Sequence, residues 1–483
     1  MGTATQLQLR LFRCATGATE EMVGGAMEEW DGTASRQACR SRCSLSAHLP
    51  SIMGGNNWPE PRLISPFIHA AAKVDTYPTI TMMADMSDYP EPDTWSTCAV
   101  PALREAAATI EKAVQMRGFH IRPPGDSEAW ERVHKILIGP RNEILWGNIH
   151  KLAGCHFQRV LTRAYSFELL LRALRSPTAH ALTKIRLLAA MQPGAGEPWC
   201  LMGLPTKWVR LDDHVFQRAA LARIGHPDPM IGMGTRCACD AYSWKSLPRI
   251  PGPNLGLTDK PHVGELEHRL GLHFHWCRIG GMSTQGHNAV SHAWLRALRK
   301  LGYTGEVYEV PIGTDRQGKQ IRGDGVAKNF AVKATVMVWD ARISTSYLAS
   351  VRSKAGKEMF VVTDYNELLK DKEKGEACKR CLQGRAEFIP IVCNSHGGLG
   401  RRAYEWLRDA FQRKVDDAAD EGAKVSARLE LVTALAEISC AVFQRNSMIM
   451  AANMRNGEEN DNGAQGDDEL AGVELEEVTM GSM

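Results

Sequence analysis

The chain has 483 residues, of which 44% are hydrophobic and 23% charged, a composition typical of soluble globular proteins. This length is enough for two to four domains with cores of their own. No run of 18 apolar residues occurs, so the sequence predicts no transmembrane helix, and the first thirty residues lack the apolar block of a secretion signal.

Charge is unevenly distributed along the chain. The formal net charge is +3, but residues 456–483 contain nine Asp and Glu and no Lys or Arg. Residues 1–455 therefore hold 58 basic against 46 acidic side chains. This basic body favours a polyanionic partner, DNA or RNA, whereas a mildly basic protein with a solvated tail explains the numbers equally well. The acidic segment 456–483 is predicted to be disordered.

The N-terminal half is predicted to be helical. Residues 1–100 show little periodicity and are predicted to be partly loop, with a short helix near 65–74 and a linker over 75–100. From 101 to 231 the apolar spacing is helical and the segment is basic, which would suit a phosphate backbone. Its helices are predicted over 102–114, 128–138, 157–174 and 179–191, with one more that Leu211-Asp212-Asp213 begins and Gly225 ends.

An α/β pattern follows from 288 to 418. Helices are predicted over 288–301, 347–382 and 402–415, and strands over 306–312, 331–343 and 388–393, with a short extended segment ending at Asp324. The predicted order is α-β-β-β-α-β-α. A further helix is expected over 419–455.

Cysteine and histidine side chains gather between these halves, over 232–287. Thiolates and neutral imidazoles at such spacings suit tetrahedral Zn²⁺. We therefore predict a structural zinc site, although the single residue between the first two thiols is tighter than usual and the alternative is a loop whose cysteines bind nothing. The predicted ligands are Cys237, Cys239, His273 and Cys277, with His287 as a substitute.

A second Cys/His set has better zinc spacing. Its members are Cys378, Cys381, Cys393 and His396. Two of the cysteines fall on a predicted helix and the third ends a predicted strand, which favours packing over metal binding. The thirteen cysteines, an odd number without a regular framework, indicate a reducing, intracellular compartment.

Several motifs together resemble the C-terminal half of reverse-transcriptase polyproteins from non-LTR (LINE-type) retrotransposons that end in a restriction-enzyme-like nuclease. The similarity covers about 49–410 in the family's order. No Tyr/Phe-x-Asp-Asp polymerase motif occurs, so reverse-transcriptase activity is not expected. The resemblance implies a truncated element, or a gene made from one. The motifs are Leu49-Pro-x-x-x-Gly54-Gly55, Gly194-Ala-Gly196 with Trp199, Leu211-x-Asp213 with Phe216, Gly271-x-His273-x-x-x-Cys277 with His287-Asn288, and Phe388-Ile-Pro390-Ile-Val392 with Gly397-Gly398.

The resemblance implies a nuclease centre of the PD-(D/E)XK kind at Asp324 and Asp340, sixteen residues apart. Carboxylates holding Mg²⁺ activate water and stabilise the charge that builds on phosphate. Gly323 replaces the proline before the first aspartate. Arg342 stands where a lysine is expected, and because it stays charged it makes a poor base. The lysine that this family places later in the chain is then Lys370, Lys372 or Lys374, and Glu309 or Glu306 is a candidate third carboxylate.

The sequence thus predicts a multidomain α and α/β protein: a helical N-terminal region, a zinc-knuckle-like segment and a PD-(D/E)XK-like domain. The expected function is nicking of target DNA for a retroelement, in the nucleus, with structural Zn²⁺ and catalytic Mg²⁺. Two alternatives are a catalytically inactive DNA- or RNA-binding remnant and a helical interaction protein with incidental cysteines. For the two aspartates, the alternative is a pair of solvated acids at a turn and a strand end.

Overall fold

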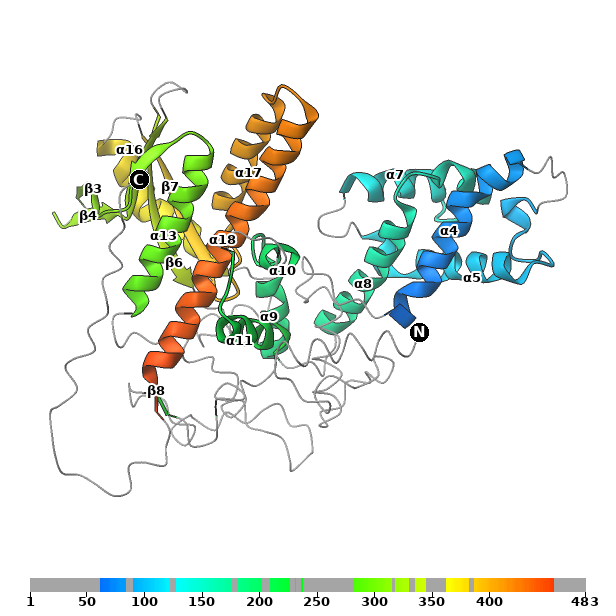
Figure 1. The fold of residues 1–483 in the computed structure, drawn as a ribbon, viewed down its shortest axis with the longest axis horizontal. Helices are drawn as coiled ribbons and strands as arrows, with labels where there is room; N and C mark the ends of the chain where they lie inside the picture. Colours follow the sequence, from blue (N-terminus) through cyan, green and yellow to red (C-terminus); the bar gives the residue numbers. More distant parts are fainter. Residues whose placement is uncertain are drawn as a thin grey trace, which may run out of the picture.

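The computed structural model describes residues 61–83, 90–121, 127–175, 181–201, 209–225, 231, 236–237, 282–314, 318–329, 335–344, 362–381 and 386–455. These residues form two groups of helices and a small mixed sheet (Figure 1). The predicted combination of α and α/β parts is confirmed at this general level. None of the described helices is both long enough and apolar enough to cross a membrane.

The first group of helices closes around one core. The core is built from apolar residues of its three longest helices, such as Phe67, Val74, Ile110, Phe157 and Leu161. Its elements are α4 (Pro61–Met83), η3 (Pro92–Thr94), α5 (Pro101–Gln115), α6 (Arg117–His120), α7 (Ser127–Leu137), η4 (Trp146–Leu152) and α8 (Phe157–Arg175).

Helix α4 is longer than predicted. The sequence predicted a helix near 65–74 followed by a linker, whereas the helix continues to Met83. Tyr77, inside the predicted linker, is buried beside Trp95 at 5.6 Å between ring centroids, and its hydroxyl donates to Glu91. This tertiary packing outweighs the weak helix propensity of a stretch that contains Pro78.

The sheet has the strand order β2-β5-β6-β7. The strands are β2 (Thr304–Glu306), β5 (Gly325–Asn329), β6 (Thr335–Ser344) and β7 (Ala386–Asn394). The first three are antiparallel, whereas β6 and β7 are parallel and are joined by a crossover that contains α15 (Val362–Lys370), a π-helical turn η7 (Asp371–Gly375) and α16 (Glu376–Cys381). The helix predicted over 347–382 is interrupted by this π-helical turn, and its residues 347–361 and 382 lie outside the described residues.

The predicted strand 306–312 is wrong as a single element. It contains the end of β2 and the start of β3 (Val310–Thr314), which pairs with β4 (Gln320–Gly323) as a separate hairpin. The chain leaves the sheet at Val307–Glu309 and crosses to the hairpin. Apolar residues alternate with polar ones on both sides of this break, so the sequence pattern alone predicts one continuous strand.

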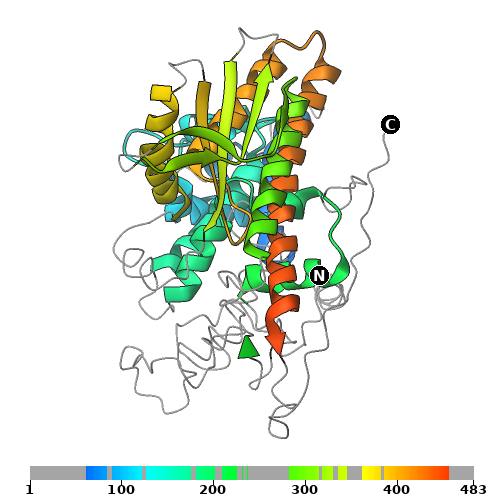
Figure 2. The same cartoon turned by 90° about the vertical axis from the view of Figure 1, so that its left-hand side faces the viewer.

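Helices cover both faces of the sheet (Figure 2). Trp339, Ala341 and Ile391 face α13 (Met282–Lys300), α17 (Arg401–Asp416) and α18 (Glu421–Asn453). Val338 and Phe388 face the opposite way, toward Cys378 of α16 and the β3–β4 hairpin. Successive strand residues point to opposite faces, so Asp340 lies on the α15–α16 side.

The second group of helices comprises α9 (Ala181–Ala190), α10 (Glu197–Leu201) and α11 (Asp213–Ile224), which ends at Gly225 in the left-handed conformation as predicted. Helices α10 and α11 pack on α18, whereas α9 packs through Leu187 on the C-terminal part of α8. Trp199 and Val215 contact Phe443, and Leu201 contacts Cys440. The helices grouped by sequence as 101–231 therefore belong to two different cores.

Candidate active site

Asp340 is a buried carboxylate in the middle of β6. Its side chain is only 3% exposed. The Lys374 ammonium lies 2.5 Å from one carboxylate oxygen, Oδ1, and the Lys370 ammonium contacts the other, Oδ2. An isolated buried carboxylate is costly, so the two lysines supply the charge compensation that its position requires.

Asp324 joins this group from the neighbouring strand. Its backbone N–H donates to the Trp339 carbonyl at 2.8 Å, which extends the β5–β6 ladder by one residue and sets Asp324 opposite Asp340. Facing residues of antiparallel strands have Cα atoms about 4.5–5.5 Å apart. The Asp324 carboxylate also accepts from the Ala341 N–H at 2.6 Å. The two predicted aspartates thus face each other at the end of the β5–β6 ladder, between the two central strands of the sheet.

Glycine permits this close approach. Asp324 lies between Gly323 and Gly325, where the chain passes from β4 to β5. A Cβ at Gly325 would lie 2.1 Å from the indole ring of Trp339. Gly323, which replaces the proline of the resembled motif, would bring a Cβ to 2.9 Å from the Trp339 carbonyl oxygen. Side chains at either position would push Asp324 away from β6.

The crossover after β6 supplies both lysines. Lys370 ends α15, and Lys374 lies in the π-helical turn η7 that follows. Lys370 also donates to the Ala341 carbonyl at 3.1 Å, and Lys374 donates to the Arg322 carbonyl at 2.7 Å. Single π-helical turns within helices frequently occur at functional sites. Of the three candidate lysines, the structure brings Lys370 and Lys374 to Asp340, while Lys372 is exposed.

Burial changes the titration of this lysine pair. Burial, and then the charge of Lys374, lower the pKa of Lys370 to about 7, against the opposing effect of the Asp324 carboxylate. Burial likewise lowers the pKa of Lys374, although Asp324 opposes this shift too. Near neutral pH, Lys370 can therefore both donate and accept a proton, as a general base requires.

His287 lies at the same group of oxygens. The residue is in the first turns of α13, with Nε2 against the Ala341 carbonyl and 3.6 Å from the Asp324 carboxylate. Burial lowers the pKa of His287, an effect that Asp324 and the carbonyl partly offset. The sequence predicted His287 as a substitute zinc ligand, whereas the structure places it beside Asp324 and the Ala341 carbonyl.

Three oxygen groups in this cluster have the chemistry of a hard-cation site: the carboxylates of Asp324 and Asp340 and the carbonyl of Ala341. Mg²⁺ prefers such oxygen ligands and keeps several waters, so two carboxylates suffice. In this structure the Ala341 carbonyl accepts a hydrogen bond from Lys370 and is in contact with Nε2 of His287. The residues therefore fit Mg²⁺. Among the described residues, no cluster of three or more His, Cys, Asp and Glu side chains could hold a metal.

Two predicted catalytic residues do not join the cluster. Glu309 is 70% exposed and pairs with Arg322. Arg342 is exposed on β6, and within the described part of the chain no ion pair is formed by it. Glu306, the other candidate carboxylate, lies on the edge strand β2. Two members of the cluster were not predicted from the sequence: His287 and the Ala341 carbonyl. A backbone carbonyl cannot be singled out from the sequence, because every residue has one.

The start of α17 fixes the crossover in place. Glu367 of α15 accepts from the backbone N–H groups of Arg402 and Ala403 at 2.9 and 3.2 Å, and Asp364 accepts from that of Arg401 at 3.0 Å. Carboxylates are favourable at a helix N-terminus. Burial raises the pKa of Glu367 to about 7 despite these donors. These contacts orient the helix that carries Lys370.

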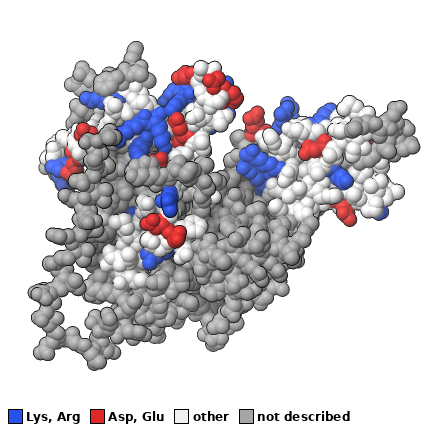
Figure 3. Space-filling view, in the orientation of Figure 1, with Lys and Arg blue, Asp and Glu red and all other residues white. Residues whose placement is uncertain are grey.

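Basic side chains gather on the surface around α17. Figure 3 shows Lys and Arg concentrated there, on the sheet unit, which is the sheet together with α13 and α15–α18. Arg402, in the first turn of α17, reaches Asp371 at 2.5 Å, next to Lys370. Arg401 is 75% exposed and Arg408 is 49% exposed. All three arginines are paired with carboxylates, those of Asp371, Glu405 and Asp409. Helix α17 nevertheless carries five basic against three acidic side chains, an excess that suits a phosphate backbone.

The predicted zinc ligands lie largely outside the described side chains. Cys239, His273 and Cys277 fall outside the described residues, and of Cys237 only the backbone is described, paired through β1 (Arg236–Cys237) with β8 (Met454–Arg455). This zinc site stays a prediction. In the second set, Cys378 and Cys393 are buried on opposite faces of the sheet, so the expectation of packing fits their placement.

Comparison with known proteins adds no identification: no protein-family model matches the chain, and no curated protein matches it.

Proposed function

We propose that this chain is a metal-dependent endonuclease that nicks DNA, with its catalytic centre at Asp324, Asp340 and Lys370. The observation that supports this proposal most strongly is the meeting of two carboxylates, a carbonyl oxygen and two lysines at one position, from β5, β6 and the crossover. In this proposal the cluster corresponds to a PD-(D/E)XK centre whose lysines, Lys370 and Lys374, come from the crossover after β6.

The oxygens of Asp324, Asp340 and Ala341 would hold Mg²⁺, which when bound lowers the pKa of water and draws charge from phosphate. Water attacks the phosphorus atom and gives its proton to Lys370, whose pKa near 7 suits that task. The bond from phosphorus to the leaving oxygen breaks, and that oxygen takes a proton from solvent. Lys374, whose ammonium lies beside Asp340, is placed to stabilise the negative phosphate.

The resemblance to non-LTR retrotransposon polyproteins supports the same proposal, because the two aspartates stand in that family's order after the Cys/His segment. The nuclease would then act on target DNA in the nucleus. Structural Zn²⁺ on Cys237, Cys239, His273 and Cys277 belongs to this proposal as well. Zinc measured in the purified chain, and lost in a Cys277→Ser variant, tests that part separately.

One observation favours a rival. Both oxygens of Asp340 already contact ammonium groups, and the side chain is nearly inaccessible. Such a closed salt-bridge cluster would suit a nuclease fold that binds nucleic acid without cutting it. The two candidates make the same contacts with the phosphate backbone and differ only in whether the cluster opens to admit a cation.

Nicking of supercoiled plasmid with Mg²⁺ or Mn²⁺ tests the choice. We expect Asp340→Asn, Asp324→Asn and Lys370→Met each to abolish nicking while DNA binding persists. Glu309→Gln serves as the matched control because it removes an exposed carboxylate outside the cluster. Binding by the wild-type chain with no metal-dependent nicking would decide for the non-cutting rival.

A further inference from the structure

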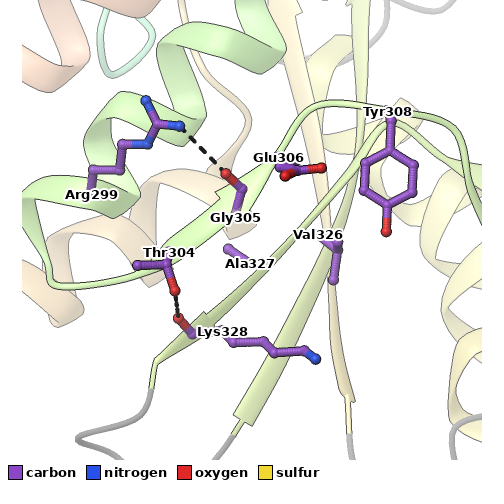
Figure 4. A pocket seen from close by; sticks show the side chains of 8 residues that line it. All are labelled: Arg299, Thr304, Gly305, Glu306, Tyr308, Val326, Ala327 and Lys328. Carbon is purple, nitrogen blue, oxygen red and sulfur yellow. Dashed lines mark hydrogen bonds between the residues drawn. The ribbon is translucent and has the colours of Figure 1, made fainter. Parts of the chain in front are cut away.

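An open pocket lies on the outer part of the sheet, separate from the aspartate cluster. Its volume is about 470 Å³, within the range of small-molecule sites. Strands β2 and β5 form its floor (Figure 4). By register, Thr304, Glu306, Val326 and Lys328 lie on the face of the sheet that points toward the α15–α16 side. The side chains that define it are Arg299, Thr304, Glu306, Tyr308, Val326 and Lys328.

The pocket carries polar groups that the fold does not use. Tyr308 is 49% exposed, and among the described residues it is the one aromatic side chain in the exposed class. Within the described part of the chain, Tyr308, Glu306 and the Lys328 ammonium form no hydrogen bond or ion pair. Arg299 is anchored by a hydrogen bond of 3.4 Å to the Gly305 carbonyl, which holds its guanidinium at the rim.

The pocket adjoins the aspartate cluster along the sheet. Val326, on its floor, is two residues after Asp324 on the same face, which corresponds to about 7 Å at 3.3 Å per strand residue. Tyr308 also lies next to Glu309, which forms an ion pair with Arg322. The backbone carbonyl of Arg322 in turn accepts a hydrogen bond from Lys374 of the cluster. A strand crossing the cluster would therefore continue over this pocket.

The chemistry of the pocket suits a nucleobase. An exposed tyrosine ring offers a stacking surface. Glu306 offers carboxylate oxygens to N–H donors, as carboxylates do toward the exocyclic amino group of cytosine. Lys328 and Arg299 provide positive charge for the adjoining phosphates. Two cations against one acid leave the pocket net positive, which suits the phosphates on either side of a base.

We propose that this pocket binds one unpaired base of the DNA strand held at Asp324 and Asp340, stacked on Tyr308 and hydrogen-bonded through an exocyclic amino group to Glu306. The proposal rests on the proposed nuclease function for the path of the strand. It adds a preference for single-stranded or opened DNA, and for adenine, cytosine or guanine over thymine at that position.

Binding without divalent metal isolates the pocket from catalysis. Fluorescence anisotropy of the full chain would use a labelled single-stranded oligonucleotide of adenine and cytosine, the same backbone made abasic, and oligothymidine. We expect Tyr308→Ala to weaken binding to the first by about 5- to 150-fold, equivalent to 1–3 kcal/mol for one stacked base, and to leave the abasic strand unaffected. Tyr308→Phe keeps the ring and should bind like the wild type.

Glu306→Gln should reduce the preference for the adenine and cytosine strand over oligothymidine. Val425→Ala, which trims a side chain that is 55% exposed on α18, is the surface control. If wild type and Tyr308→Ala bind with equal affinity while nicking still depends on Asp340, the proposal of a base-binding pocket is refuted and the proposed nuclease function is retained. Tyr308-dependent binding with no nicking would support the pocket and overturn the nuclease. Failure of the wild type to bind single-stranded DNA would also overturn the pocket.

Discussion

Replacing Asp340 by Asn should destabilise the sheet unit, and by an amount that depends on pH. The substitution removes the carboxylate but leaves the Lys370 and Lys374 ammonium groups, 10% and 24% exposed, facing each other. Removing one partner of a buried ion pair typically costs about 3–5 kcal/mol, because the remaining charge is uncompensated. For a unit of this size, that corresponds to a fall in unfolding temperature of about 6–20 °C.

The pH dependence follows from Lys370. Its pKa in the folded chain is lowered to about 7, well below the ordinary 10.5 that the unfolded chain has, and the loss of Asp340 lowers it further. Between these two pKa values the unfolded state binds more protons, so stability rises with pH. Above about pH 7, Lys370 is neutral in both folded forms, so the pH-dependent part of the destabilisation by Asn is absent there. It appears below about pH 7 and grows as pH falls toward the lower pKa of the variant.

Thermal unfolding followed by tryptophan fluorescence at pH 6 and pH 9 measures this difference, since Trp339 is adjacent and buried. The double variant Asp340→Asn with Lys370→Met should recover part of the loss at pH 6, because it removes one of the uncompensated charges. Equal unfolding temperatures of wild type and Asp340→Asn at both pH values would refute the argument that this carboxylate compensates two buried ammonium groups.

Three further outcomes are expected. The rate of plasmid nicking should rise with pH through about 7 as Lys370 loses its proton, and Lys370→Arg should lack both the rise and the activity. The pKa of Glu367 is raised to about 7 in the folded chain, so between pH 4.5 and 7 the folded state binds more protons than the unfolded state. The free energy of unfolding should therefore fall as pH rises from 4.5 to 7, and Glu367→Gln should remove that fall in denaturant titrations. Gly325→Ala should destabilise by about 1–3 kcal/mol or more through collision with Trp339, measured by denaturant unfolding, while Gly147→Ala, with open space around it, should have little effect.

The sequence predicted long helices better than short strands. Helices α5, α7, α8 and α17 begin and end within two residues of their predicted bounds, because their apolar spacing and their core packing agree. The region 304–329 was harder: four short strands and two changes of direction replaced one strand and an extended segment. Each strand is too short for its alternation to mark where a neighbour begins.

The same reasons explain what could be predicted of the candidate site. Asp324 and Asp340 stood out through family order and strand position, and the antiparallel ladder places them side by side. The lysines could not be assigned, because the register of the crossover depends on a π-helical turn that periodicity does not reveal. His287 was assigned by its spacing from cysteines, while its position beside Ala341 arises from packing of α13 on the sheet.

Helix α18 makes the sheet unit depend on residues beyond 418. Ser439 lies within hydrogen-bond distance of carbonyls from two distant loops, those of Gly194 at 2.6 Å and Gly397 at 2.8 Å. A premature stop codon anywhere between 421 and 439 would therefore uncover α13 and release α10 and α11 together. An expression fragment cut at 288 and 418 would lack part of its own interior, so the smallest fragment worth producing runs from about 181 to 455.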